Sequence, residues 1–279
     1  MIYISKELLK TFKDSLFNEE KSYATIQKYI RDVKALSDWL SNEPITKALL
    51  VQYKKHLSEK YAPSSVNAAI ASLNHFFDFC GNCELKLKTL KLQRQIFMRS
   101  EIELTKAEYQ RLLNAAMTRK NERLYLVMQT ICASGIRISE LKYVTVEAIT
   151  KGFAEIDSKG KRRTVFLNDK LCKILKRFAK DKKIKSGAVF VTKNGNPLDR
   201  SNIWSDMKKL CGDANVSSKK VFPHNLRHLF ARTYYSIQKD IVRLADILGH
   251  SSINTTRIYT MESGEIHRKQ IQKLGLLRC

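Results

Sequence analysis

The sequence predicts a mainly α-helical protein with two domains: an N-terminal helical bundle, then a mixed α+β domain with a small antiparallel sheet. Three observations support this fold class. A chain of 279 residues is long enough for about two domains. Apolar residues recur at helical spacing through most of the chain, and β-like runs occur only between residues 152 and 192. We expect the bundle at residues 1–85, a basic linker at 86–103 and the second domain at 104–279.

Four helices are expected in the bundle. The first covers Ser5 to Phe17, the second begins after Ser22, the third near Thr46 and the fourth near Pro63. Serine and threonine side chains can accept from the free N–H groups of a first helical turn, and proline is tolerated there. Short connections between such helices are typical of a small bundle.

The linker, "ELKLKTLKLQRQIFMRSEIE", mixes lysine and arginine with isolated leucines. We interpret it as a segment that runs along a phosphate backbone. A solvated connector explains the same charges equally well.

The second domain begins with a helix start, because Thr105 and Glu108 have the spacing of a capping box. An apolar helix, a turn at Gly135 and another helix follow. The runs "GFAEID" and "RRTVFL" predict a hairpin, "AVFVT" a third strand and "KNGNP" a turn. The rest is expected to be helical, with Pro223 in a first turn.

The charge is strongly positive, with 51 Lys and Arg against 27 Asp and Glu, or +24 in all. A basic surface of this kind favours a polyanion partner, most simply nucleic acid, over a protein that is merely soluble. No run approaches the roughly 18 apolar residues of a membrane span, and no signal-peptide core is present. We therefore expect a cytoplasmic protein with reduced cysteines. The Cys80–Cys83 pair lacks the second ligand pair of a zinc site.

The C-terminal part contains an ordered set of residues suited to phosphoryl transfer. Arginine forks can hold phosphate oxygens, and a tyrosine hydroxyl can attack phosphorus to give a covalent intermediate. Such chemistry needs no metal or other cofactor. The candidate catalytic residues are Arg137, Lys159, His224, Arg227, His250 and Tyr259.

Other residues are expected to support this set. Glu140 lies three positions after Arg137 on a helix and would buttress it. Lys161 competes with Lys159 for the role of catalytic lysine in the same basic turn. The expected DNA contacts are Lys161, Arg162, Arg163 and Arg200. His228 is assigned a packing role, and a tyrosine such as Tyr259 would by itself be read as a core residue.

The segments "ASGIRISEL", "PHNLRH" and "LGHSSINTTRIYT" together resemble the tyrosine recombinases, or phage-integrase family. The family pattern is Arg…Lys…His-x-x-Arg…His/Trp…Tyr. The pattern S-x-x-T-x-x-x-Y-x-x-D from Ser22 to Asp32 is similar to the family's helical, SAM-like core-binding domain. The turn "SKGKRR" is one residue shorter than the family's G-K-G-x-K-x-R, and Lys159 is the better match to the catalytic lysine.

The resemblance implies a site-specific recombinase that integrates, excises or inverts DNA, as in mobile elements, through a 3′-phosphotyrosyl intermediate at Tyr259. Arg137 and Arg227 would hold nonbridging oxygens, and His250 would donate to the phosphate. His224 would help with the tyrosine proton, and Lys159 would protonate the 5′-oxygen.

Double-stranded DNA with specific sites, a homotetramer on two sites and an optional accessory factor are the implied partners, and no membrane is implied. The alternatives are a type IB topoisomerase-like enzyme and a non-catalytic DNA-binding regulator. The C-terminal segment from about Ser263 would pack on its own domain or on a neighbouring protomer.

Overall fold

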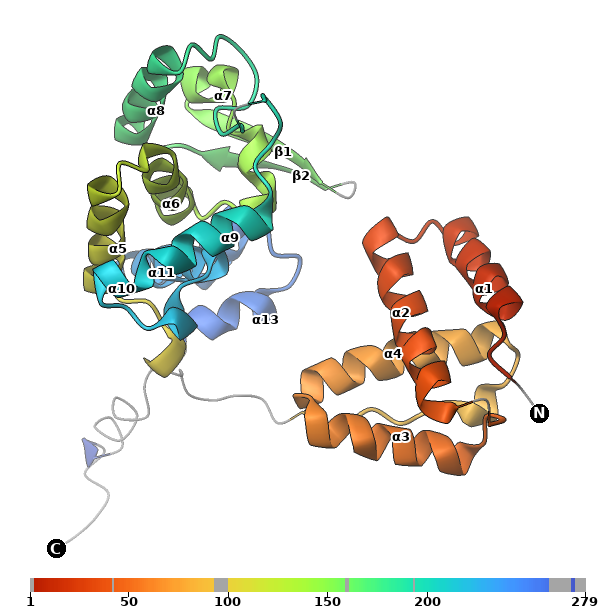
Figure 1. The fold of residues 1–279 in the computed structure, drawn as a ribbon. Helices are drawn as coiled ribbons and strands as arrows, with labels where there is room; N and C mark the ends of the chain where they lie inside the picture. Colours follow the sequence, from red (N-terminus) through yellow and green to blue (C-terminus); the bar gives the residue numbers. More distant parts are fainter. Residues whose placement is uncertain are drawn as a thin grey trace, which may run out of the picture. The chain divides into compact units, whose positions relative to one another are not determined.

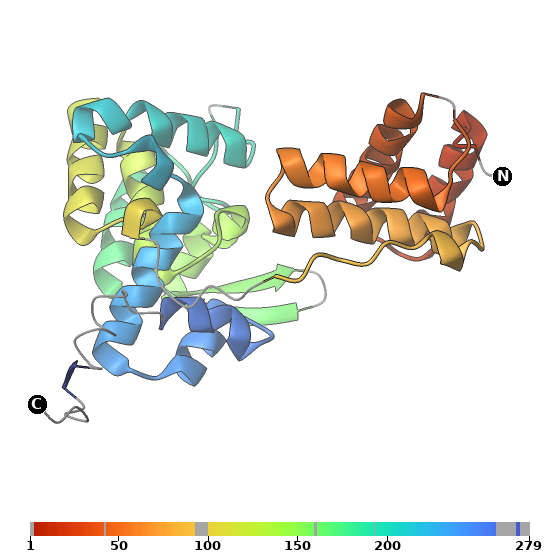
Figure 2. The same ribbon diagram turned by 90° about the horizontal axis from the view of Figure 1, so that it is seen from below.

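The computed structural model describes residues 3–41, 43–92, 100–158, 161–192, 194–260 and 272–273. Only the backbone is described at Ser100, Ser158 and Lys161. The chain forms two compact units, Met1–Arg94 and Gln95–Cys279, whose elements are labelled in Figure 1 and seen from below in Figure 2. Most of the C-terminal segment, for which docking was expected, lies outside the described residues.

The N-terminal unit is the expected helical bundle. Its helices are α1 (Lys6–Asn18), α2 (Tyr23–Leu40), α3 (Lys47–Lys60) and α4 (Pro63–Phe79), followed by the 3₁₀ turn η1 (Cys83–Leu85). The side chains of Ser5, Ser22 and Thr46 accept from the backbone N–H groups of the first turns, and for Ser22 this is the cap that the sequence predicts. Helix α4 packs against the other three helices (Figure 1). Their apolar faces form one core.

A polar link ties α2 to α4. Lys28 Nζ lies 2.5 Å from Asp32 Oδ2 and 2.8 Å from Ser72 Oγ. Ser72, fully buried, donates in turn to Asp32 at 2.7 Å. Because the carboxylate accepts from both groups, it satisfies the buried hydroxyl. The aspartate of the Ser22–Asp32 motif thus has a structural task in this bundle.

The first half of the expected linker is part of the N-terminal unit. Asn74 pairs with the backbone of Leu87 through both its amide atoms, at 2.9 and 2.8 Å. Asn67 pairs with Leu90 in the same way, at 2.9 and 2.7 Å. Leu85 and Leu87 are buried in the bundle core. Residues 86–92 are therefore a strap packed on the bundle, which corrects the expectation of a connector here, and 93–99 lie outside the described residues.

The second unit is built mainly from helices. The longer ones are α5 (Lys106–Thr118), α6 (Glu122–Ser134), α8 (Asp169–Asp181), α9 (Arg200–Lys209), α11 (Pro223–Gln238) and α12 (Ile241–Leu248). The short ones are η2 (Ser100–Ile102), η3 (Ile138–Tyr143), α7 (Val146–Lys151), α10 (Cys211–Ala214), η4 (Ser218–Lys220), α13 (Ile253–Thr256) and η5 (Arg257–Tyr259). The predicted capping box at Thr105 and Glu108 is present. Helix α11 packs along α6.

The small sheet has two strands among the described residues. β1 (Phe153–Ser158) and β2 (Lys161–Phe166) pair antiparallel, with Ile156 opposite Arg163. The predicted third strand is wrong: Ala188 and Val191 form only isolated bridges, to Thr145 and Pro197. Pro197 has no N–H with which to continue a ladder. Of the turn predicted at "KNGNP", residues 194–197 are described and form a turn, with Gly195 at φ +77°.

Among the described helices, none has the length and apolar character needed to cross a membrane.

Candidate active site

The end of α6 places the first candidate arginine. Gly135 ends the helix with φ +66°, and its N–H donates to Ile131 O at 2.9 Å. A side chain at Gly135 would lie 2.5 Å from the ring of Phe230, so only glycine fits here. Arg137 then caps η3, a 3₁₀ helix where the sequence suggested an α-helix. The turn directs Arg137 toward Gly249, to whose carbonyl it donates at 3.3 Å.

Glu140 holds Arg137 in place, as expected of a supporting residue. Its Oε2 accepts from the backbone N–H of Arg137 and its Oε1 from the guanidinium, both at 2.9 Å. Burial alone would raise the pKa of Glu140. The backbone hydrogen bond from Arg137 and the charges of Arg163 and Arg137 outweigh burial and lower that pKa. The carboxylate is therefore ionised and fixes the arginine.

Arg163 is turned into the protein, which differs from the DNA contact expected for it. Its side chain is 13% exposed and donates to Glu140 Oε2 at 2.5 Å. A second N–H donates to Ile247 O at 2.7 Å, at the end of α12. Burial lowers the pKa of Arg163, and the charge of Glu140 opposes that shift. Arg163 on β2 thus links η3, through Glu140, to the end of α12, through Ile247, and so supports Arg137.

Arg227 is the most buried charge of the cluster, at 1% exposure. From α11 it donates to Gly135 O at 2.5 Å and to Leu248 O at 2.6 Å. Its Nη2 also lies 3.1 Å from His250 Nε2. Burial, then the charges of Arg137 and Arg163, lower its pKa to about 10, so it stays cationic at neutral pH. One guanidinium therefore connects the ends of α6 and α12 to His250.

His250 is fixed through both ring nitrogens. Gly249 ends α12 with φ +62°, and His250 follows it. Since an arginine N–H can only donate, Nε2 of His250 accepts from Arg227. Its Nδ1 then carries the hydrogen and donates to Thr256 Oγ1 at 2.8 Å. Burial, followed by the charge of Arg227, lowers the His250 pKa to about 4. The imidazole is neutral in this arrangement.

Tyr259 lies against His250 and is 5% exposed. The two rings are nearly parallel, at 17°, with centroids 6.2 Å apart. Burial raises the pKa of the phenol, and the charges of Arg227, Arg137 and Arg232 partly offset that rise. The hydroxyl is therefore protonated at neutral pH and surrounded by cations.

The two histidines of α11 form a row of edge-to-face ring contacts that leads to Tyr259. His224 lies in the first turn behind Pro223, and its ring packs on that of His228 with the centroids 4.6 Å apart. The His228 ring in turn meets Tyr259 edge to face, at 5.1 Å and 79°. Burial lowers the pKa of both histidines to about 4, helped by the charge of Arg227. Sequence reasoning missed the His228 contact, because nothing local links residues 31 positions apart.

The remaining candidates stay outside this cluster or outside the described residues. Lys159 is not described, and neither is the side chain of Lys161. Arg162 is 89% exposed and pairs with Asp157 at 3.3 Å. Arg200 is exposed at the start of α9. Arg162 and Arg200 thus remain candidates for contacts with a ligand outside the cluster.

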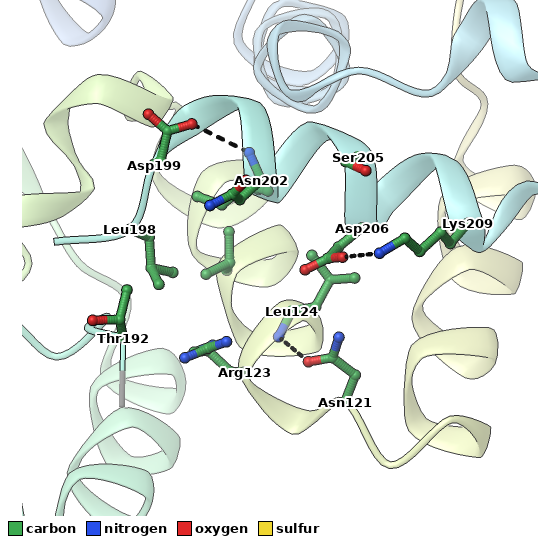
Figure 3. A pocket seen from close by; sticks show the side chains of 12 residues that line it. Asn121, Arg123, Leu124, Thr192, Leu198, Asp199, Asn202, Ser205, Asp206 and Lys209 are labelled. Atoms are coloured by element: carbon green, nitrogen blue, oxygen red, sulfur yellow. Dashed lines mark hydrogen bonds and ion pairs between the residues drawn. The ribbon is translucent and has the colours of Figure 1, made fainter. Parts of the chain in front are cut away.

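A separate hollow of about 260 Å³ lies between the start of α6 and α9 (Figure 3). Figure 3 shows the Asp206–Lys209 ion pair, 2.8 Å long, on its wall. Of the candidate catalytic residues that the structure describes, none lines it.

Comparisons with known proteins agree with the two-unit fold. The family model described as "Phage integrase family" matches residues 103–265, and "Phage integrase, N-terminal SAM-like domain" matches residues 9–81. Tyrosine recombinase XerD of Halalkalibacterium halodurans is 30% identical over 258 residues, covering 85% of this chain and 86% of the relative. Tyrosine recombinase XerA of Pyrococcus furiosus is 28% identical over 285 residues, which cover 98% of this chain and 96% of the relative. A lambda integrase dimer bound to a core site shares the fold at a TM-score of 0.73 and 18% identity. The match covers 91% of this chain and 94% of the integrase chain.

The fold and these matches define an enzyme that breaks and rejoins DNA strands. The chain belongs to the phage integrase family, and it is a site-specific tyrosine recombinase. The resemblance noted in the sequence is thereby confirmed.

Proposed function

We propose that this recombinase cuts double-stranded DNA at specific sites with Tyr259 as its nucleophile. The observation that carries the proposal is the surroundings of Tyr259. The rings of His228 and His250 pack against its ring, and the charges of Arg137 and Arg227 act on its phenol. The two arginines come from different elements, the start of η3 and α11, and each is held by carbonyl or carboxylate partners. A preorganised pair of this kind can stabilise charge that develops on a phosphate.

The chemical steps follow from those groups. The Tyr259 oxygen forms a bond to the scissile phosphorus and gives its proton to the neutral imidazole of His224, while the bond from phosphorus to the 5′-oxygen breaks. The leaving 5′-oxygen takes a proton from a lysine, for which Lys159 is the first candidate and Lys161 the second. The free 5′-hydroxyl of a partner strand then attacks the phosphotyrosine and releases Tyr259. Each bond broken is replaced by one of the same kind, so the cycle needs no nucleotide cofactor.

The phosphate would be held by the cations of the site. Arg137 and Arg227 donate to the nonbridging oxygens. His224, in the first turn of α11, lies at the positive end of that helix and faces the same anion. His250 would donate to the phosphate after Arg227 releases its Nε2 and that nitrogen takes up a hydrogen, since here Nε2 accepts from Arg227. Arg162 and Arg200 would contact DNA outside the cluster.

The working assembly would be four protomers on two DNA sites. Lambda integrase, which has this fold, has been solved as a tetramer bound to a Holliday junction. The net charge of +24 suits a protein that spans many phosphates.

Covalent capture tests the proposal. Wild type and Tyr259→Phe are mixed with fragmented genomic DNA, the mixture is denatured, and protein-linked fragments are sequenced. We expect fragments that share one motif with wild type and none with Tyr259→Phe, while both proteins retain DNA binding. Equal linkage by the two proteins would contradict the assignment of the nucleophile.

A further inference from the structure

The phenol of Tyr259 sits beside a histidine that the proposed chemistry does not use. His228 lies one helical turn after His224 on α11, and the rings of His228 and Tyr259 pack edge to face at a centroid distance of 5.1 Å. The side chain of His228 is 18% exposed, so the contact is largely shielded from water. A residue in this place can determine how the nucleophile is oriented.

One nitrogen of His228 is open. Its Nε2 is buried and has no hydrogen-bond partner among the residues that the structure describes. A buried polar atom without a partner costs stability, and native proteins rarely keep one unless it has a task. The other ring nitrogen, Nδ1, lies 3.9 Å from Glu103 Oε1.

The surroundings decide which nitrogen carries the hydrogen. Because a carboxylate can only accept, Glu103 favours the tautomer with hydrogen on Nδ1. Glu103 is itself held by an ion pair with Arg232 on the next turn of α11. With hydrogen on Nδ1, as the charge of Glu103 3.9 Å away favours, the lone pair of His228 is on Nε2 and this nitrogen can accept a hydrogen bond. His250 offers no such acceptor, because Arg227 occupies its Nε2.

We propose that His228 is a positioning residue for the nucleophile: its ring packs edge to face with the ring of Tyr259, and its Nε2, which has no partner among the described residues, accepts the phenol hydrogen bond when DNA is bound. Such a bond would turn a lone pair of the phenol oxygen toward the phosphorus. The inference rests on the proposed role of Tyr259.

The first test compares side chains at position 228. His228→Phe keeps a flat ring but has no acceptor, and His228→Gln keeps an acceptor of similar reach. On a nicked substrate at saturating protein, we expect covalent-complex formation by His228→Phe to be on the order of 10- to 100-fold slower than by wild type, since misplacement of a reacting atom has effects of that size. We expect His228→Gln to recover a large part of the rate, and the Kd for DNA to stay within about twofold in both, because neither variant changes a phosphate contact.

The matched control is His75→Phe in the other unit. His75 also meets a tyrosine edge to face, Tyr29, at 5.4 Å. We expect this variant to cleave at the wild-type rate. The proposal would be overturned if His228→Phe formed the covalent complex as fast as wild type. It would also be overturned if His228→Gln were as slow as His228→Phe.

A second measurement needs no substitution at position 228, so it tests the proposal even if the His228 variants fold poorly. With ¹⁵N-labelled histidine, the Nε2 resonance of His228 is compared between wild type and Tyr259→Phe, each bound to a half-site. We expect the resonance to move when the hydroxyl is removed, and an unmoved resonance would overturn the proposal. Failure of the proposed function would look different: wild type would then form no Tyr259-dependent covalent complex at all.

Discussion

Two adjacent arginines of β2 have opposite environments. Arg162 is 89% exposed, whereas Arg163 is 13% exposed and bonded to Glu140 and Ile247. Since side chains alternate across a strand, neighbours in sequence face opposite sides. The same residue type therefore contacts solvent at one position and supports the active site at the next.

We predict that Arg163→Met is far more harmful than Arg162→Met. Removing Arg163 leaves the buried Glu140 with one cationic partner, Arg137. Breaking a buried pair in this way costs about 3–5 kcal/mol, whereas an exposed substitution changes stability by about 0.5 kcal/mol or less. Urea denaturation of the two variants measures this difference.

The same comparison has an activity readout. Cleavage by Arg163→Met should fall along with its stability, because Arg137 loses its support. Equal unfolding free energies for the two variants would contradict the role assigned to Arg163.

Single-residue environments could be predicted only in part. Val165 is buried, and Arg163 stands two positions before it, so strand alternation alone could have placed Arg163 on the inner face. Its partner Glu140 lies 23 positions away, and no local pattern indicates that pairing. The contact between His228 and Tyr259 is equally non-local. The order of motifs was enough to predict the candidate catalytic residues. Most of the groups that hold them, such as Arg163 and the carbonyls of Gly135 and Leu248, became visible only in the fold.

At the scale of elements, the cluster is assembled from helix ends. Gly135 ends α6 just before Arg137, Pro223 begins α11 just before His224, and Gly249 ends α12 just before His250. Helix ends leave backbone groups without intrahelical partners. Arg227 uses two of these, the carbonyls of Gly135 and Leu248. The site is therefore built where the backbone has free acceptors for buried arginine.

We predict that Gly249→Ala lowers both stability and cleavage. The residue has φ +62°, and a Cβ there would collide with Cδ of Arg163 and lie 2.9 Å from its Nε. Arg163 cannot move aside easily, because Glu140 and Ile247 hold its guanidinium.

Gly152→Ala is the matched control. Gly152 ends α7 with φ +85° and has nothing within 4 Å of the added Cβ. It should lose only the backbone term of about 1–2 kcal/mol and keep its cleavage rate. A Gly249→Ala variant no worse than Gly152→Ala in unfolding and cleavage would refute the tight fit against Arg163.

Helix starts were predictable because caps are local. Ser22 and Thr105 cap the helices that the sequence assigns to them, and Thr46 caps the helix that was expected to begin near it. The strap at 86–92 was not predictable, since its hydrogen bonds come from Asn67 and Asn74 on α4. The absent third strand has a similar cause: an apolar run shows β preference but does not say which partner strand would pair with it.

At the scale of the whole molecule, positive charge determines how stability depends on pH. The chain carries +24, and the second unit concentrates three neutral histidines beside buried arginines. Protonating any of these imidazoles adds a charge next to like charges. The second unit should therefore tolerate alkaline conditions better than mildly acidic ones.

We predict that the second unit loses stability as pH falls from about 6.5 toward 4. In the folded chain the pKa values of His224, His228 and His250 are lowered to about 4 from an ordinary 6.5. Between those values the unfolded chain binds protons that the folded chain does not, so acidification favours unfolding. Carboxylates with lowered pKa, such as Glu140, contribute stability that is lost only below about 4.5, their ordinary value.

The measurement uses the two tryptophans, one in each unit. Trp39→Phe leaves Trp204 on α9 as the only tryptophan, so its fluorescence reports urea unfolding of the second unit. We expect the unfolding free energy to drop steadily between pH 6.5 and 4.5, and a further His228→Gln substitution to make that slope shallower. A flat profile over this range would show that the imidazoles are not held neutral by the fold. An unchanged slope after His228→Gln would instead place the titration on the other two histidines.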